Sequence, residues 1–313
     1  MRNLSILITQ ARRATENLEF SDSVGITDNE FIQYANDAQD ELEAQISKAN
    51  ADVNIEKTYI DCVQGQEDYL LPDDTLLHTK LAHVLWSPNG SESQFRALQQ
   101  GRPSEIISTY TGSPSFYVRL GQTVKVIPAP QASSSKLKIY YQQKLPRLEV
   151  QAGKVGAVTT SGNTITALTL DSGFSAYDKD TLLEEGFVTI CDASGNVKMK
   201  AIPITDIDDT TLDVTVDPSF VFEDGETIAV GDFVLRGKRS TSHCSLPDIC
   251  ERYLLAYMQW RILKRDSSND AIEQKDEMQM MLASIVDAYN EPDYAVDGIP
   301  IIDTQYLDLE GRL

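Results

Sequence analysis

The spacing of the apolar residues changes twice along the chain, and this change limits the possible folds more than any other feature. Near the N-terminus apolar residues recur three or four positions apart, the period of an amphipathic helix. Between residues 56 and 237 the period falls towards two, which is typical of strands. A helical period returns after residue 245. The sequence therefore predicts an α+β chain with helices at its two ends and strands between them.

Before residue 50 the pattern predicts two helices. The first covers Leu4–Leu18. The second begins after Thr27, which is followed three residues later by Glu30, the spacing of a capping box. Its buried stripe is predicted to consist of Phe31, Ala35, Ala38, Leu42, Ile46 and Ala49.

Strand patterns dominate two segments of different composition. The first predicts a small antiparallel β region, with strands at Lys57–Val63, Leu81–Trp86, Phe116–Leu120, Thr123–Pro128 and Lys136–Gln142. The second, residues 151–237, is predicted to be almost purely strand and turn and to form an inserted all-β barrel or sandwich. Its strands are predicted at Val155–Thr160, Thr164–Leu168, Phe187–Asp192, Lys198–Ile207, Thr211–Val216 and Thr227–Leu235.

Two further helices are predicted near the C-terminus. Ser245 and Pro247 give a helix-start signal. The apolar stripe that follows is Ile249, Tyr253, Ala256, Trp260 and Leu263. The next helix is predicted over Ser268–Tyr289, with Ala271, Met278, Met281, Leu282, Ile285 and Tyr289 facing inward. We expect these helices and the N-terminal pair to form an α-helical bundle.

The last segment, residues 290–313, has no helical period, yet it is rich in apolar residues. Because a free disordered tail is poor in such residues, we expect it to pack on its own domain or against a neighbouring protein. The predicted organisation has four parts: residues 1–150 (helix pair and β region), 151–237 (β-module), 238–289 (helices that complete the first part) and 290–313 (extended tail).

The formal net charge of −21 limits the possible partners. Such an acidic surface repels phosphate backbones, so tight nucleic-acid binding is not expected, whereas an acidic channel wall would let DNA slide without sticking. We find no secretory signal and no membrane-spanning segment, and expect a cytosolic chain or an assembly formed in the cytosol. The four cysteines include no CxxC pair and are expected to be free thiols.

No pattern of catalytic residues stands out. The phosphate-binding and hydrolase motifs GxxxxGK[ST], GxGxxG, GxSxG and HExxH are absent. The only histidines are His78, His83 and His243. His243, Cys244 and Cys250 lack the spacing and the fourth ligand of a zinc site, and the acidic run Asp206–Asp209 is expected to be a solvated hairpin instead of a calcium loop. We therefore expect no enzyme activity, no cofactor and no metal.

Five short motifs follow one another along the chain. They are Ile26-Thr27-Asp28-Asn29-Glu30-Phe31, Tyr69-Leu70-Leu71-Pro72-Asp73, the Gly-x-Pro-x-x-Tyr step at Gly112–Tyr117, Pro128-Ala129-Pro130 and Leu137–Tyr141. In this order they resemble the head-to-tail connector (adaptor) proteins of tailed bacteriophages, of the podophage-like kind. The resemblance covers roughly residues 1–150 and, more loosely, 240–290. Residues 151–237 are an insertion relative to the smaller members.

The resemblance implies a structural virion protein of the neck between capsid and tail, assembled in the host cytoplasm. It implies a homo-oligomeric ring, commonly a dodecamer, that docks under the portal protein and extends the DNA channel, with genomic DNA only as passing cargo. Tail or nozzle proteins would attach to it, and we assign the β-module to that contact as a hypothesis. In several relatives a C-terminal extension reaches into the portal. The residues expected to bind the portal are therefore Tyr294, Ile299, Ile301, Ile302, Tyr306 and Leu307.

Three alternatives stay open. A receptor- or carbohydrate-binding virion module would need exposed aromatic side chains. Residues 151–237 offer Phe174, Tyr177, Phe187, Phe220, Phe222 and Phe233. Another neck or tail protein of the same assembly would share this organisation, and an enzyme would need a pocket of converging acids with shifted pKa values.

Overall fold

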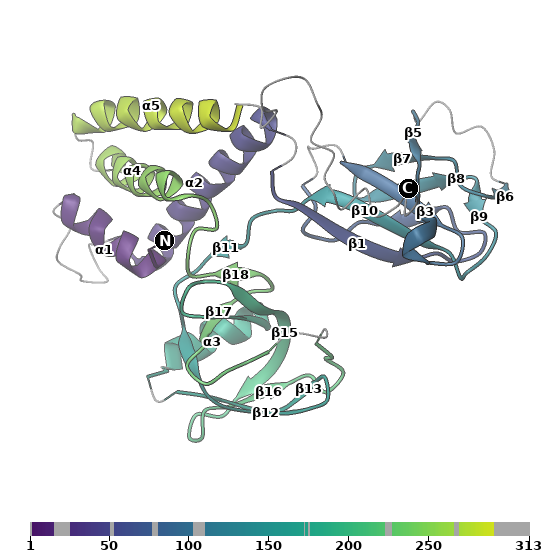
Figure 1. Cartoon of the computed structure of the whole chain (residues 1–313). Coiled ribbons are helices and arrows are strands. Elements are labelled where there is room, and N and C mark those ends of the chain that lie inside the picture. The colour runs from purple at the N-terminus through teal and green to yellow at the C-terminus, as the bar shows by residue number, and fades with distance from the viewer. Residues whose placement is uncertain are drawn as a thin grey trace, which may run out of the picture. The chain divides into compact units, whose positions relative to one another are not determined.

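The computed structural model groups the chain into two compact units (Figure 1). The first comprises residues 1–42 and 145–285, and the second comprises residues 43–144 and 286–313. The residues that the structure describes are 2–15, 26–50, 53–76, 81–102, 110–171, 173–174, 176–222, 227–265 and 269–290.

Helices α1 (Leu4–Ala14) and α2 (Asp28–Ala49) form where the sequence predicts helices. Residues 16–25 lie outside the described part, so the predicted extension of the first helix to Leu18 stays a prediction. The capping box of α2 is confirmed: the amide of Thr27 donates to Glu30 Oε2 at 2.9 Å, and the amide of Glu30 donates to Thr27 Oγ1 at 3.3 Å. The stripe predicted for α2 is buried except for Ala49, which is half-buried.

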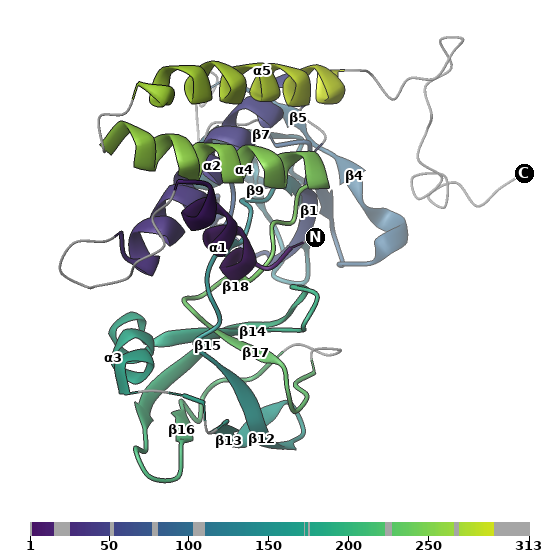
Figure 2. The ribbon, with the colours of Figure 1, turned by 90° about the vertical axis from the view of Figure 1, so that its left-hand side faces the viewer.

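Helices α4 (Asp248–Arg265) and α5 (Asp270–Asn290) confirm the two helices predicted near the C-terminus. Helix α1 packs against α4 (Figure 2), and Arg2, just before α1, pairs with the buried Glu251 of α4 at 3.0 Å. Helix α5 buries Met278 and Ile285 as predicted. The prediction that Ile249 is buried is wrong: it lies in the first turn of α4 and is 41% exposed, whereas Tyr253 and Ala256, further along the same stripe, are buried. A single bundle of all these helices stays a prediction.

A closed six-stranded barrel confirms the barrel form of the predicted β-module. Its strands pair in the order β12-β13-β16-β15-β14-β17, and β17 closes the barrel by pairing with β12. The strands are β12 (Gly153–Ser161), β13 (Thr164–Leu170), β14 (Phe187–Cys191), β15 (Val197–Ile207), β16 (Asp213–Val216) and β17 (Phe233–Arg236). Alternate residues of each strand fill one apolar core, which includes Val155, Ile190 and Met199.

The prediction that residues 151–237 are almost purely strand and turn is wrong in one place, because helix α3 (Ala176–Glu185) lies between β13 and β14. Leu182 of α3 is buried in the barrel core, and the helix lies beside β14 and β15 (Figure 2). Gly186 ends the helix with φ of +68°, and its amide donates to the carbonyl of Leu182 at 3.1 Å. The strand predicted over Thr227–Leu235 is limited to Phe233–Arg236.

The second unit contains two four-stranded sheets that share one core (Figure 1). The first sheet has the order β1-β10-β3-β4 and the second β2-β8-β7-β5. Their pairings are antiparallel except for β5 with β7, and the separate pair β6–β9 is also parallel, so the predicted antiparallel region is confirmed with two parallel contacts among the described residues. The elements of this unit are β1 (Ile55–Asp61), β2 (Asp68–Leu70), β3 (His83–Ser87), η1 (Glu92–Gln94), β4 (Arg96–Ala97), β5 (Gln99–Gln100), β6 (Thr111–Gly112), β7 (Phe116–Leu120), β8 (Thr123–Ile127), β9 (Ala129–Pro130) and β10 (Lys136–Gln142). The bounds of the four parts predicted from the sequence stay predictions.

Candidate functional site

Two short strands connect the barrel to the helices of the first unit. Strand β11 (Arg147–Leu148) leads into the barrel and β18 (Ser240–Thr241) follows it, and the two pair in parallel. The amide of Arg147 donates to the carbonyl of Arg239, and the amide of Glu149 donates to the carbonyl of Thr241, both at 3.0 Å. Because successive backbone groups of a strand point to opposite sides, the amide and carbonyl of Leu148 face away from β18.

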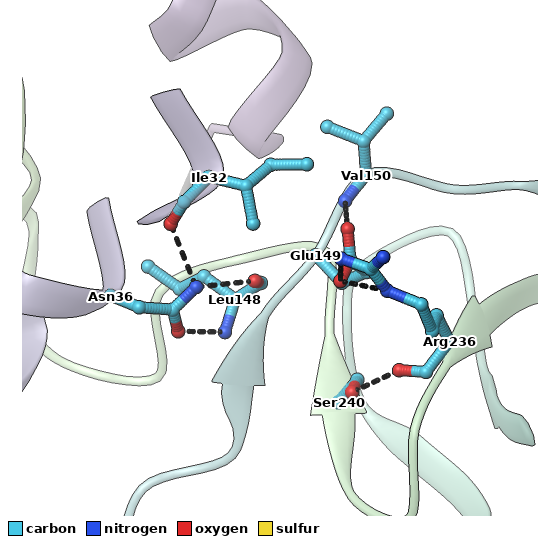
Figure 3. A network of polar contacts seen from close by, with 7 residues as sticks. All are labelled: Ile32, Asn36, Leu148, Glu149, Val150, Arg236 and Ser240. Carbon is cyan, nitrogen blue, oxygen red and sulfur yellow. Dashed lines mark hydrogen bonds and ion pairs between the residues drawn. The ribbon is translucent and has the colours of Figure 1, made fainter. Parts of the chain in front are cut away.

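A side chain of α2 takes up these two backbone groups of Leu148 (Figure 3). Asn36 Nδ2 donates to the carbonyl of Leu148 at 2.9 Å, and the amide of Leu148 donates to Asn36 Oδ1 at 2.9 Å. The same Nδ2 also donates to the carbonyl of Ile32 at 2.8 Å, which fixes the rotamer of Asn36. Leu148 itself is 1% exposed. The side-chain carboxamide of Asn36 thus takes the place of a neighbouring strand and holds β11 against α2.

Glu149, the next residue, forms a buried ion pair with Arg236 at the end of β17 (Figure 3). Arg236 donates from Nε and a terminal nitrogen to Glu149 Oε2 at 3.1 and 3.0 Å, and the amide of Val150 donates to Oε1 at 3.2 Å. Burial raises the pKa of the Glu149 carboxyl, and the charge of Arg236 opposes that rise. The ion pair ties the first residue after β11 to the last strand of the barrel.

A pocket of about 260 Å³ opens beside this ion pair, and we call it the basic pocket. It is lined by Arg147, Glu149, Glu185, Phe187, Arg236, Gly237, Lys238, Arg239 and Ser240. Four of these side chains are cationic and two are anionic, in a chain whose net charge is −21. The ammonium of Lys238 lies 4.7 Å from the centre of the Phe187 ring, a cation–π contact that holds the wall in place. The chemistry of the basic pocket suits a negatively charged group.

A second pocket, of about 400 Å³, shares Arg239 with the basic pocket and is lined in part by Asn196, His243 and Cys244. His243 Nδ1 and the hydroxyl of Ser242 share a hydrogen bond of 2.9 Å, and burial lowers the pKa of His243. Among the described residues no three His, Cys, Asp or Glu side chains are placed to hold a metal ion. His243 is therefore part of the packing around β18 in this structure.

The acidic run at residues 206–209 forms a hairpin turn. Asp208 accepts hydrogen bonds from the amides of Thr210 and Thr211, each at 2.7 Å, and Asp209 pairs with Lys179 of α3 at 2.7 Å. The carboxylate of Asp208 thus stabilises the turn, and the carboxylate of Asp209 ties it to α3.

The aromatic side chains of the barrel do not form an exposed platform among the described residues. Phe174, Phe220 and Phe222 pack against the barrel core. Phe187 and Phe233 are half-buried and lie under Lys238 and Lys154. The side chain of Tyr177 is outside the described part.

In the part of the chain that the structure describes, no helix is long and apolar enough to cross a bilayer.

The residues predicted to bind a portal, Tyr294, Ile299, Ile301, Ile302, Tyr306 and Leu307, all lie outside the described residues, as does His78. The basic pocket was missed by the sequence reasoning. Its signal is local: Arg236-Gly237-Lys238-Arg239 places three cations in four residues of a strongly acidic chain. The Asn36–Leu148 contact joins residues 112 positions apart and has no such signal.

Comparison with known proteins identifies the family model of the SU10 adaptor protein as a match over residues 2–165. The match spans α1, α2, both sheets of the second unit, β11 and β12. No curated protein matches the chain.

Proposed function

The chain belongs to the SU10 adaptor protein family, a family of phage structural adaptors, and we propose that it forms the head-to-tail adaptor ring of a podophage-like virion. In this proposal the ring is twelve-fold, docks under the portal in the neck, extends the DNA channel and receives the tail or nozzle proteins. Assembly takes place in the host cytoplasm.

The observation that carries the proposal is the family match over residues 2–165, which includes the helix pair and both sheets. A structural adaptor is a non-enzymatic kind of protein, and its function is association through buried surface. The net charge of −21 supports a channel role, because an acidic wall does not retain a passing phosphate backbone. Native mass measurement of the purified chain, alone and with portal, tests both the ring and the partner. A chain that stays monomeric and ignores the portal would refute the proposal.

We assign portal binding to the tail residues Tyr294, Ile299, Ile301, Ile302, Tyr306 and Leu307. A chain truncated after Tyr289 should keep its helical signal and melting temperature but should no longer sediment with portal-bearing capsids. A full-length variant with all six residues replaced by serine should fail in the same way. The matched control replaces the polar tail residues Thr304 and Gln305 with alanine and should bind normally. Unchanged capsid binding by the truncated chain would remove this assignment.

We assign attachment of tail components to the barrel, on the grounds that it is a self-contained module. Because β11 and β18 are adjacent, a short linker from Val150 to Lys238 can replace residues 151–237. The deletion removes Arg236, so it should carry Glu149→Gln to avoid an unpaired buried charge. This variant should bind portal and block tail attachment. Normal tailed particles would count against the assignment, and a glycan-binding screen of the full chain tests the receptor-binding alternative.

A further inference from the structure

Two cations of the basic pocket form no ion pair within the described residues, although the charge of Arg147 acts on the nearby Glu149 carboxyl. Arg147 and Lys238 are exposed, and neither forms an ion pair with any residue in the described ranges, whereas Arg236 is engaged by Glu149. The β11–β18 pairing holds the backbone of Arg147, and the carbonyl of Lys238 accepts a hydrogen bond from the amide of Ala201 at 2.8 Å. The four cations of the pocket outnumber its two carboxylates, and such an excess of positive charge attracts a negatively charged group at low ionic strength.

Helix α5 carries the complementary surface. Glu273, Asp276, Glu277 and Met280 recur at helical spacing and lie on one face, and all four are exposed. The three carboxylates form no ion pair with a described residue, and Met280 is 67% exposed. This face lies away from Met278 and Ile285, through which α5 packs on the protein. It offers carboxylates next to an apolar side chain, as the basic pocket offers cations next to Phe187.

DNA is a poorer occupant of the basic pocket than an acidic protein surface. The chain has 48 acidic residues against 27 Lys and Arg, so a duplex brought to the pocket meets repulsion from the surrounding surface. A pocket of about 260 Å³ holds one or two side-chain carboxylates. A second copy of this chain carries such side chains on α5.

We propose that the basic pocket binds the α5 carboxylates Glu273 and Glu277 of a second copy of this chain. The two surfaces differ, so the contact is heterologous: each copy gives its α5 face to one neighbour and its pocket to the other. Contacts of this type close into rings when the rotation between copies allows it. The inference rests on the proposed ring and names the side chains that set its subunit contact.

Charge reversal tests the pairing in the full-length protein. Arg147→Glu with Lys238→Glu reverses the pocket, and Glu273→Lys with Glu277→Lys reverses the helix face. Each double variant should need at least about tenfold more protein to assemble, measured by sedimentation velocity and native mass spectrometry. An equimolar mixture of the two double variants should assemble again, because each pocket then meets an oppositely charged helix. All four substituted residues are exposed, so circular dichroism and melting temperature should match those of the wild type.

The matched control for the pocket variant is Lys57→Glu with Lys200→Glu, which lowers the net charge by the same amount at two exposed lysines outside both surfaces and should assemble like the wild type. Wild-type assembly should also weaken as salt rises. Reversed variants that assemble normally, or a mixture that fails to assemble, would overturn the pairing while leaving the ring in place. A wild-type chain that is monomeric on its own would overturn the pairing too, whereas portal binding would still decide the adaptor function. Binding of a duplex oligonucleotide that Arg147→Glu with Lys238→Glu abolishes would reassign the pocket to DNA.

Discussion

Replacing Asn36 with alanine should loosen the attachment of the barrel to α2. Asn36 is the hydrogen-bond partner of both the amide and the carbonyl of Leu148, and Leu148 is buried. The substitution removes both bonds and leaves two buried backbone groups without a partner. No apolar contact of comparable size is gained, because alanine is smaller than asparagine.

The expected loss of stability follows from these two groups. Each buried polar group left unsatisfied costs about 1–3 kcal/mol. Alanine is a better helix former than asparagine and returns up to about 0.7 kcal/mol within α2. Because Asn36 is half-buried, water can reach part of the vacated space, which favours the lower half of the range. After the helix-propensity gain is subtracted, we expect Asn36→Ala to lower the free energy of unfolding by about 1–3 kcal/mol.

Urea unfolding followed by circular dichroism measures this change, and hydrogen exchange at the Leu148 amide locates it. The control is Gln33→Ala, which lies on the exposed side of the same helix and should change stability by less than about 0.5 kcal/mol. The Leu148 amide should exchange much faster in Asn36→Ala and at the wild-type rate in the control. If Asn36→Ala is as stable as Gln33→Ala and keeps the slow exchange at Leu148, the role given to this contact is wrong.

Three other predictions follow from described contacts. Arg236→Met should destabilise the protein by about 3–5 kcal/mol at neutral pH, because it leaves the Glu149 carboxylate buried and unpaired. Burial already raises the pKa of Glu149, so the folded state holds this proton more tightly than the unfolded state does. The destabilisation by Arg236→Met should therefore shrink as pH falls through that raised pKa. A destabilisation that is independent of pH, or that Glu149→Gln does not reduce, would contradict this. Thr27→Ala removes the α2 cap and should cost about 1 kcal/mol in urea unfolding, with no change at all as the contrary outcome. Burial raises the pKa of Cys244 to about 11 and of Cys250 to about 12, and all four cysteines are buried. Iodoacetamide at neutral pH should therefore label no cysteine in the folded protein and all four in urea. Fast labelling of the folded protein would contradict this.

The sequence predicts elements well where one local pattern decides them. Strands Phe116–Leu120 and Lys136–Gln142 have the predicted bounds, because each is a short run of strand-forming residues bounded by turn residues, and the second also alternates in burial along most of its length. The cap of α2 is equally local. Helix α3 was missed because Leu182 and Leu183 alone supply apolar residues to its second half, too few to show a helical period.

The polar junction could not be predicted from the sequence. A carboxamide that bonds the backbone, as Asn36 does at Leu148, depends on where two distant segments meet and not on the type of residue at the second position. Ile249 shows the same limit: its spacing fits the stripe that buries Tyr253 and Ala256, but it lies in the first turn of α4, and no local pattern shows where along a helix the covering segments begin. The basic pocket is an intermediate case, because three of its cations are neighbours in the sequence and Arg147 reaches them only through β11.

The neighbouring positions of β11 and β18 have an evolutionary consequence. A domain whose two connections to the rest of the chain lie side by side can be gained, lost or replaced in evolution without a change in the path of the remaining chain. Recombination at this point would let related phages exchange the barrel. Asn36 of α2 would still bind the backbone of the connecting strand, because its hydrogen bonds go to the main chain of Leu148.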